Sequence, residues 1–385
     1  MINDKDFELI AAEGTPAYVY DTDLLAKTLH RVVEASSVNP KFKVHYAMKA
    51  NSEPFVLKAV RDAGLGLDTV SGGEIEAGLK AGFNPRSIVY AGVGKTDKEI
   101  DLALTAGIGT FNVESFAELE VISERATRLG KIARVALRLN PDIDAHTHHY
   151  ITTGLTENKF GINMSHLDEA VELAAALPSV ELVGLHFHIG SQITILEPFR
   201  ILCEKINAIL SHLSNRGIKL RTVNVGGGLP IDYENPIKNN IPDFKSYFET
   251  FNSLLNTDAV SEVHFELGRS IVGQCGFLVS KVIYVKEGDT RRFAIIDAGM
   301  NNLMRPALYQ ARHAVRNISG DIRGDKHTLV DVVGPVCESS DDFGADHSLS
   351  FPKRGDTFVI YSAGAYGQSM ASHYNSRPDA RTVII

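Results

Sequence analysis

Short runs of β-branched and aromatic residues alternate with longer segments of helical periodicity between about residues 40 and 270. This alternation is typical of parallel strands joined by crossover helices. The eight strands predicted from it cover residues 44–49, 67–70, 88–92, 110–113, 134–139, 182–188, 222–225 and 262–266. The predicted helices include residues 55–63, 74–81, 115–129, 196–216 and 244–255. Glycines typical of helix ends follow several of these segments: Gly64, Gly82, Gly130 and Gly217.

Eight strand–helix units over this length match an α/β fold of the (β/α)8 TIM-barrel type, and a doubly wound open sheet is the alternative that periodicity leaves open. After residue 270 the pattern changes to strand-like runs without long helices, at 277–285, 293–297, 327–333 and 357–361. A further strand-like run, 17–20, precedes the barrel pattern. We therefore predict a barrel over 22–269 and a mostly β domain formed by 1–21 and 270–385.

Composition and charge narrow the class of partner. Of the 385 residues, 44% are hydrophobic, which is enough for a large core, and the formal charge is −8 with no basic block. This balance argues against nucleic acid or an anionic membrane surface and favours a small-molecule partner. We see neither a signal peptide nor a run of apolar residues long enough to span a membrane. Three scattered cysteines fit a reducing cytoplasm better than a disulfide framework.

Polar residues of unusual kind stand where the barrel strands end. Lys49 closes the first strand, where desolvation would lower its pKa and make its amine a nucleophile for a Schiff base, although a solvated strand-end lysine is the simpler interpretation. The sixth strand carries His186 and His188 on one side, which suits two metal ligands, or one core ring and one ring stacked on a flat ligand.

The last two strands lead into glycine-rich turns. The seventh runs into Gly226, Gly227 and Gly228, and the eighth into Glu266-Leu267-Gly268-Arg269. Loops at this place in a barrel commonly hold a phosphate. A nucleophilic lysine, a stacking histidine, a phosphate cradle and a carboxylate together meet the needs of pyridoxal 5'-phosphate, whose ring acts as an electron sink.

Motifs along nearly the whole chain carry a resemblance to a known family. They are HYAMKAN at 45–51, NPDIDAHTHHYITTG at 140–154, ENKFGI at 157–162, GLHFHIGSQ at 184–192, ELGR at 266–269, MRPALY at 304–309, GPVCESSD at 334–341 and GAY at 364–366. In this order they resemble the alanine-racemase-fold (fold-type III) pyridoxal-phosphate decarboxylases, and within them the branch that acts on diaminopimelate.

The resemblance implies a cytoplasmic homodimeric enzyme that decarboxylates meso-2,6-diaminopimelate to L-lysine and CO2, the last step of lysine biosynthesis, with pyridoxal 5'-phosphate as cofactor. It implies Lys49, His188 and Cys337 as catalytic residues, the last as proton donor. The cofactor-binding set that it implies is Lys49, Asp68, His188, Ser191, Gly226, Gly227, Gly228, Glu266, Gly268, Arg269 and Tyr366, with Glu266 at the pyridine nitrogen.

The substrate-binding set implied by the resemblance is Arg269, Arg305, Tyr309, Glu338 and Tyr366. In this family Cys337 and Glu338 would come from the partner subunit of the dimer. Two arginines suit a substrate with a second carboxylate, and Glu338 suits its second amine.

Two positions depart from the family pattern. Leu267 replaces a proline that would fix the backbone of the turn, and Pro230 stands where a glycine is more usual and lacks a backbone donor. Both functional side chains of the turn are still present, so Leu267 leaves the expected chemistry in place. Pro230 would lower the affinity for the cofactor if the missing backbone N–H contacted the phosphate.

Other interpretations remain at this point. A sibling decarboxylase of ornithine, arginine or carboxynorspermidine would share the cofactor residues, although Arg305 and Tyr309 argue for a distal carboxylate and against ornithine. A non-catalytic relative would be expected to lack Lys49, Cys337 or the β domain. A metal-dependent hydrolase would use His186 and His188.

Three further features are interpreted as structural or as loop elements. The histidines 146, 148 and 149, with Asp142 and Asp144, are taken as loop structure rather than a metal site, so we predict no metal. Cys203 and Cys275 are taken as buried residues. The long loop 141–164 is predicted to close over the substrate.

Overall fold

The computed structural model describes residues 2–143 and 159–385 and divides the chain into two compact units. One unit comprises Leu29–Pro230 and Asp243–Gly268, and the other comprises the chain up to Thr28, Ile231–Pro242 and Arg269–Ile385. We call them the barrel unit and the β unit. The domain limits predicted from the sequence differ from this division at residues 22–28, at the segment 231–242 and at Arg269, and they stay a prediction.

The barrel unit contains a closed ring of eight parallel strands, as predicted. They are β2 (Phe42–Ala47), β3 (Gly66–Thr69), β4 (Ile88–Tyr90), β5 (Thr110–Val113), β6 (Ala133–Asn140), β8 (Val180–His186), β9 (Thr222–Asn224) and β10 (Glu262–Leu267). The pairing of β5 with β6 closes the ring, which excludes the open doubly wound sheet. A short extra strand, β7 (Ile162–Asn163), pairs with the end of β6.

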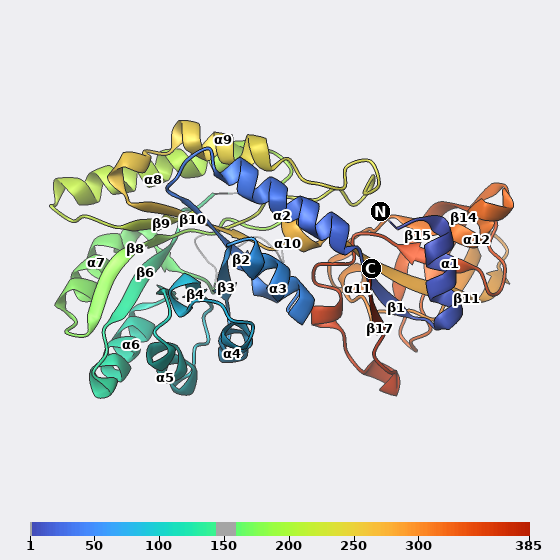
Figure 1. The fold of residues 1–385 in the computed structure, drawn as a ribbon, viewed down its shortest axis with the longest axis horizontal. Coiled ribbons are helices and arrows are strands. Elements are labelled where there is room, and N and C mark those ends of the chain that lie inside the picture. The colour runs from blue at the N-terminus through green and yellow to red at the C-terminus, as the bar shows by residue number, and fades with distance from the viewer. Residues whose placement is uncertain (1, 144–158) are drawn as a thin grey trace. The chain divides into compact units, whose positions relative to one another are not determined.

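Helices surround the ring on its outer side (Figure 1). They are α3 (Pro54–Asp62), α4 (Gly72–Lys80), α5 (Asp97–Ala106), α6 (Phe116–Leu129), α7 (Leu167–Ala176), α8 (Glu197–Asn215) and α9 (Phe244–Leu254), while α2 (Thr22–Ser36) connects the units along the chain. The sequence sets their limits: Ser115 caps α6 through the Glu118 amide, and Gly130 ends it in the left-handed conformation that favours glycine.

An aromatic cluster packs α8 and α9 against the outer face of β2 and β10. It consists of Phe42, Phe199, Tyr247, Phe248, Phe251 and Phe265. Most of its ring pairs meet edge to face with centroids 4.8–5.9 Å apart, an arrangement that adds to the gain from burial. The barrel therefore has its apolar core between sheet and helices.

The β unit is built on a mostly antiparallel sheet in the order β13-β16-β11-β12-β14-β15, with β1 and β17 joined to β11 through β1. Its strands are β1 (Ala17–Tyr20), β11 (Gly276–Glu287), β12 (Arg292–Ile296), β13 (Val315–Asn317), β14 (His327–Val333), β15 (Asp342–Ser350), β16 (Thr357–Ile360) and β17 (Arg381–Ile384). Its helices are α1 (Asp4–Glu13), α10 (Arg269–Val272), α11 (Arg305–Tyr309) and α12 (Ile318–Arg323). The mostly β prediction is confirmed.

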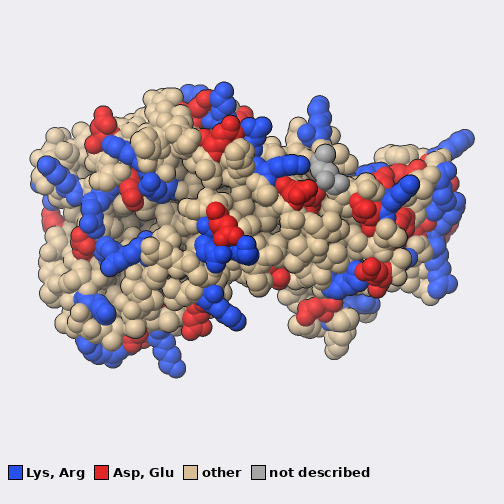
Figure 2. All heavy atoms as spheres, in the orientation of Figure 1, with Lys and Arg blue, Asp and Glu red and all other residues tan. Residues whose placement is uncertain are grey.

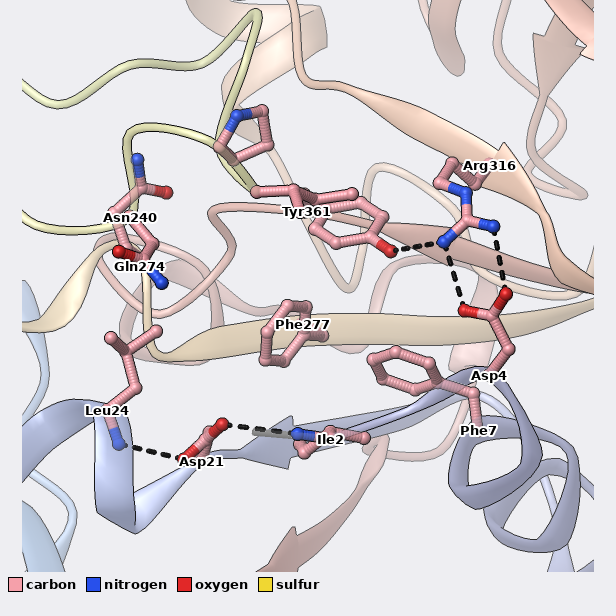
Figure 3. A pocket seen from close by; sticks show the side chains of 12 residues that line it. Ile2, Asp4, Phe7, Asp21, Leu24, Asn240, Gln274, Phe277, Arg316 and Tyr361 are labelled. Atoms are coloured by element: carbon pink, nitrogen blue, oxygen red, sulfur yellow. Dashed lines mark hydrogen bonds and ion pairs between the residues drawn. The ribbon is translucent and has the colours of Figure 1, made fainter.

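The first helix of the β unit is held by both packing and charge. Phe7 of α1 packs edge to face on Phe277, with ring centroids 5.3 Å apart. Asp4 accepts two hydrogen bonds of 3.0 Å from Arg316, whose guanidinium also reaches the Tyr361 hydroxyl (Figure 3). A cavity of about 240 Å³ lies beside these side chains, within the β unit.

Surface features agree with the expectation from composition. On the face shown in Figure 2, acidic and basic side chains are interspersed rather than gathered by sign. No helix in the described ranges is both long and apolar enough to cross a membrane.

The aromatic cluster generates a stability prediction. Phe251 is fully buried in it, so Phe251→Ala removes most of its packing and should cost about 3–5 kcal/mol. Leu254 lies on the same helix with 36% of its surface exposed, so Leu254→Ala should cost much less. Urea unfolding followed by far-ultraviolet circular dichroism measures both, and equal losses would show that the cluster does not hold the barrel together.

Candidate active site

Glu266 is a buried carboxylate inside the barrel, at the end of β10, and donors from three other strands surround it. Its Oε1 accepts hydrogen bonds from the side-chain amides of Asn224 (2.7 Å) and Asn112 (3.2 Å). Its Oε2 lies 3.1 Å from His186 Nε2. Burial raises the pKa of Glu266, and Lys49, Arg138 and the Asn224 amide counteract that rise. With donors on both oxygens, Glu266 is arranged to act as an anion.

His186 is therefore a neutral donor. Burial, reinforced by the nearby Arg138 cation, holds the pKa of His186 well below its usual range. A neutral imidazole that donates from Nε2 has no proton on Nδ1, and Nδ1 is buried without a hydrogen-bond partner among the described residues. His186 Nε2 thus holds Glu266, and no group of three metal-ligating side chains occurs within the described ranges.

Lys49 lies in a single helical turn directly after β2, two residues beyond the end of the strand, whereas the sequence predicted it as the last residue of that strand. Its Nζ is 3.9 Å from Oδ2 of the buried Asp68. Burial, with the charge of Glu266, raises the pKa of Asp68 to about 8. The Lys49 side chain is 41% exposed, so the desolvation predicted for it is not observed in the single chain. Asp68 Oδ1 has no hydrogen-bond partner among the described residues.

The second histidine of the pair, His188, lies two residues beyond the end of β8, not within a strand as predicted. Its Nδ1 accepts a hydrogen bond of 3.2 Å from the Gly227 amide, which leaves the proton on Nε2. Burial, together with Lys49 and Arg138, lowers the pKa of His188 well below its usual range. The structure therefore presents His188 as a neutral ring whose plane is fixed from one edge.

The glycines that follow β9 are packed against the neighbouring strands. A Cβ atom at Gly227 would lie 2.0 Å from the Glu266 carbonyl oxygen, so no larger residue fits there. The amides of Gly226 and Gly227 donate to Asn224 Oδ1 and His188 Nδ1. Two donors of the predicted phosphate cradle are thus already used inside the barrel.

An ion pair between Arg138 of β6 and Glu114, the residue directly after β5, lies in the same barrel interior, and the sequence analysis did not identify it. Arg138 Nη1 donates to Glu114 Oε1 at 2.8 Å, and both side chains are at least 94% buried. Glu114 also accepts hydrogen bonds from the amides of Gly92 and Gly161. The guanidinium of Arg138 lies over the Phe160 ring, 4.7 Å from its centroid. The pair thereby fixes residues 160–161 to the strand ends.

Two arginines of the predicted substrate-binding set meet around one tyrosine in the β unit. Arg269 Nη1 donates to the Tyr233 hydroxyl at 2.6 Å, and the Arg305 guanidinium lies 4.6 Å from the centroid of the Tyr233 ring. Arg269 also lies 4.9 Å from the centroid of the Tyr366 ring. Tyr233 was not identified from the sequence, because it stands alone in the segment 231–242 without a motif.

Arg305 is buried against neutral groups. Its Nη1 donates to His313 Nε2 at 2.7 Å, and its Nε has no hydrogen-bond partner among the described residues. His313 Nδ1 in turn donates to the Tyr361 carbonyl oxygen. Burial lowers the pKa of Arg305 to about 10, which leaves the guanidinium charged at neutral pH. A buried cation held in this way is suited to binding an anion.

The remaining predicted site residues range from exposed to buried in the single chain. Cys337 and Glu338 are exposed, and the Cys337 amide donates to Asn375 Oδ1 at 2.8 Å. Tyr309 and Ser191 are partly buried, and Gly268 leads from β10 to Arg269. Cys203 and Cys275 are buried as expected. The histidines 146, 148 and 149, with Asp144 and most of the loop 141–164, lie outside the described residues.

His313 yields a prediction on pH. Burial and the Arg305 cation lower its pKa to about 3, whereas the unfolded chain binds this proton near pH 6.5. The low pKa of His313 makes stability depend on pH. The folded state has its full stability relative to the unfolded chain above pH 6.5 and loses it as the pH falls toward 3, because the unfolded chain then binds more protons. Between pH 6.5 and pH 3 the free energy of unfolding, measured by urea titration, should therefore fall by about 3–5 kcal/mol less for His313→Gln than for the wild type. The exposed His327→Gln is the control, and identical pH profiles for all three proteins would contradict the assignment.

Comparison with known proteins places this geometry in a family. Residues 25–273 match the family described as "Pyridoxal-dependent decarboxylase, pyridoxal binding domain". The chain is 52% identical to the diaminopimelate decarboxylase of Bacteroides thetaiotaomicron over 94% of this chain and 93% of that protein. The structure of the Helicobacter pylori diaminopimelate decarboxylase complexed with L-lysine is similar with a TM-score of 0.91, at 42% identity, and covers 98% of this chain and 93% of that one.

A second solved structure, the diaminopimelate decarboxylase of M. jannaschii in co-complex with L-lysine, gives a TM-score of 0.90 at 37% identity, over 98% of this chain and 89% of that one. The resemblance seen in the motifs is therefore confirmed along almost the full length of the protein. The chain belongs to the diaminopimelate decarboxylase family of pyridoxal-dependent decarboxylases.

Proposed function

We propose that this chain decarboxylates meso-2,6-diaminopimelate to L-lysine and CO2 with pyridoxal 5'-phosphate as cofactor, and that it acts as a homodimer in the cytoplasm. The observation that carries the proposal is the buried Glu266 carboxylate, held by three neutral donors in the barrel interior that also contains Lys49 and Asp68. The full-length similarity to diaminopimelate decarboxylases supports the choice of substrate.

The barrel residues fit the cofactor. Lys49 supplies a primary amine for the Schiff base, and Asp68 offers a buried carboxyl oxygen, Oδ1, that has no hydrogen-bond partner among the described residues. Glu266 would bind the ring nitrogen, and the neutral His188 would pack on the ring face. Ser191, Gly226, Gly227, Gly228, Gly268, Arg269 and Tyr366 would surround the phosphate. The amides of Gly226 and Gly227 already have hydrogen-bond partners within the protein. These two glycines would therefore leave room for the phosphate rather than donate hydrogen bonds to it.

When bound, pyridoxal 5'-phosphate provides the electron sink for the electron pair that stays on the α carbon when CO2 leaves. The protein supports this chemistry electrostatically. An anionic Glu266 keeps a proton on the atom that it faces, because its two oxygens are oriented by Asn112, Asn224 and His186. A neutral His188 adds no positive charge beside Lys49.

The arginines of the β unit would bind carboxylates of the substrate. Arg269 and Arg305 offer guanidinium forks, and Tyr233 holds both in place. Glu338 would pair with the distal amine, and Tyr309 and Tyr366 would complete the pocket. A distal carboxylate is the feature that separates diaminopimelate from ornithine, and the orphaned Nε of the buried Arg305 supports its presence.

Cys337 would return a proton to the α carbon after CO2 leaves. In the single chain Cys337 and Glu338 are exposed, and an acid that works at one atom must be shielded from water. We therefore propose that a second copy of the chain receives these two residues in its active site. All three cysteines are free thiols, which fits the reducing cytoplasm.

The function is tested first by CO2 release from meso-2,6-diaminopimelate, with and without added pyridoxal 5'-phosphate. We expect release that depends on the cofactor, and little or none from ornithine, arginine or carboxynorspermidine, which do not present a carboxylate at the matching distance from the reacting end. Lys49→Ala should lose both turnover and the visible absorbance of the lysine-bound cofactor. Release from another amine alone would show that Arg305 and Tyr309 have been assigned wrongly.

The shared active site is tested by mixing two inactive variants. Lys49→Ala and Cys337→Ala each inactivate every site of their own dimers, whereas a mixed dimer has one site with both residues intact if they come from different subunits. Unfolding and refolding the two together should therefore restore about a quarter of the wild-type activity, because about half of the dimers are mixed. The Lys49→Ala/Cys337→Ala double variant refolded with wild type is the control, and no recovery in the first mixture would place both residues in one subunit.

A further inference from the structure

A second cavity lies at the amino-terminal ends of the barrel strands, the end opposite to the one where Lys49 and Glu114 stand. It has a volume of about 320 Å³ and lies entirely within the barrel unit. Its charged and titratable lining consists of Arg86, Arg134, Arg221, His45, His264 and Glu262. This end of a barrel normally serves stability, so a cavity with three arginines there calls for another explanation.

The three guanidinium groups come from separate segments and are only partly neutralised. Arg86 is exposed and makes no side-chain hydrogen bond or ion pair with any described residue. Arg134 donates from Nε and Nη2 to the carbonyl oxygens of Gly109 and Ile108, contacts that fix its side chain without cancelling its charge. Arg221 pairs with Glu181 at 2.9 Å, with about half of each side chain exposed, so the pairing is weak.

The one carboxylate in the lining, that of Glu262, already has a partner within the protein. Glu262 Oε2 lies 2.9 Å from His264 Nε2, and Lys43 and Arg221 lie close enough to help lower its pKa. Cations therefore exceed carboxylates around this cavity, in a chain whose net charge is −8. A local excess of positive charge against the sign of the whole protein favours an anionic ligand.

Two neighbouring histidines, with their ring planes tilted by 42°, belong to the lining. The rings of His45 and His264 lie with centroids 4.6 Å apart, and His45 is 95% buried. His45 Nδ1 has no hydrogen-bond partner among the described residues. A buried polar atom without a partner costs free energy unless water or a ligand reaches it, and His45 is one of the residues that line this cavity.

We infer that this cavity is a binding site for a small anion of the phosphate class, inorganic phosphate or a phosphate monoester. Guanidinium groups from three separate segments suit a group with two negative charges and several acceptor oxygens, whereas a monocarboxylate would be served by one fork. The Thr110 and Thr222 positions in the lining add hydroxyl groups beside the arginines. The site is separate from the cofactor phosphate cradle, which follows β9 at the carboxyl end of the strands.

The test is isothermal titration of the cofactor-loaded enzyme with inorganic phosphate at constant ionic strength, because bound cofactor then fills the catalytic phosphate site. We expect one phosphate per chain, and at saturation a rise in melting temperature of about 2–4 °C. The double variant Arg86→Gln/Arg221→Gln should bind at least about tenfold more weakly, since two charged partners are lost. Acetate should bind much more weakly than phosphate.

Arg128→Gln is the matched control, because Arg128 is an exposed barrel-unit arginine paired with Asp101 and lies outside the cavity lining. It should bind phosphate like the wild type. Three results would overturn the inference: no binding to the loaded wild type, undiminished binding to the double variant, or an equal loss in Arg128→Gln.

Discussion

A carboxylate that must stay charged inside a closed barrel is the constraint on which this structure depends. Glu266 is 93% buried, and an unpaired anion at that depth would take up a proton. The barrel opposes this with donors on both oxygens, from β5, β8 and β9. Each donor is neutral, so Glu266 is solvated by the protein and still has its charge available to a ligand. The positions of β5, β8 and β9 therefore influence the charge of Glu266 on β10.

The same constraint explains why the barrel interior is polar. TIM barrels usually fill their interior with layers of branched apolar side chains. Here the inward positions carry His186, Asn112 and Asn224 around Glu266, with the Arg138–Glu114 pair nearby. Such groups add little stability, because desolvation offsets much of what their contacts provide. Apolar burial takes place on the outer face instead, where the aromatic cluster packs under α8 and α9.

The sequence was sufficient to predict the elements and the type of chemistry, and insufficient to predict the surroundings of each group. Strand–helix alternation identified eight strands, and motifs identified Lys49 and Glu266. Strand β15 was missed because its polar residues, such as Asp346 and His347, hide the alternation. Asn112 and Arg138 carried a usable signal, since each is a polar residue in an otherwise buried strand. Which partner each would find depends on the register between strands distant in sequence, and a single sequence does not contain that register explicitly.

The treatment of arginine in the β unit separates structural from functional cations. Arg316 and Arg323 bind carboxylates of the fold, Asp4 and Asp321 for the first and Asp325 and Asp356 for the second. Their charge is used within the protein. Arg305 instead donates to a neutral imidazole and lies on an aromatic ring. His313 can accept this bond only while it is unprotonated, and the low pKa of His313 follows in part from the same cation.

A carboxylate in the place of His313 would hold Arg305 more strongly, but it would also cancel the charge that a substrate carboxylate needs. The neutral His313 holds the Arg305 cation less strongly, but it leaves the positive charge available to a substrate carboxylate. This is the same solution that the barrel applies to Glu266, with the sign reversed. In both units a buried charge is oriented by neutral groups, so that its natural counter-ion is the ligand.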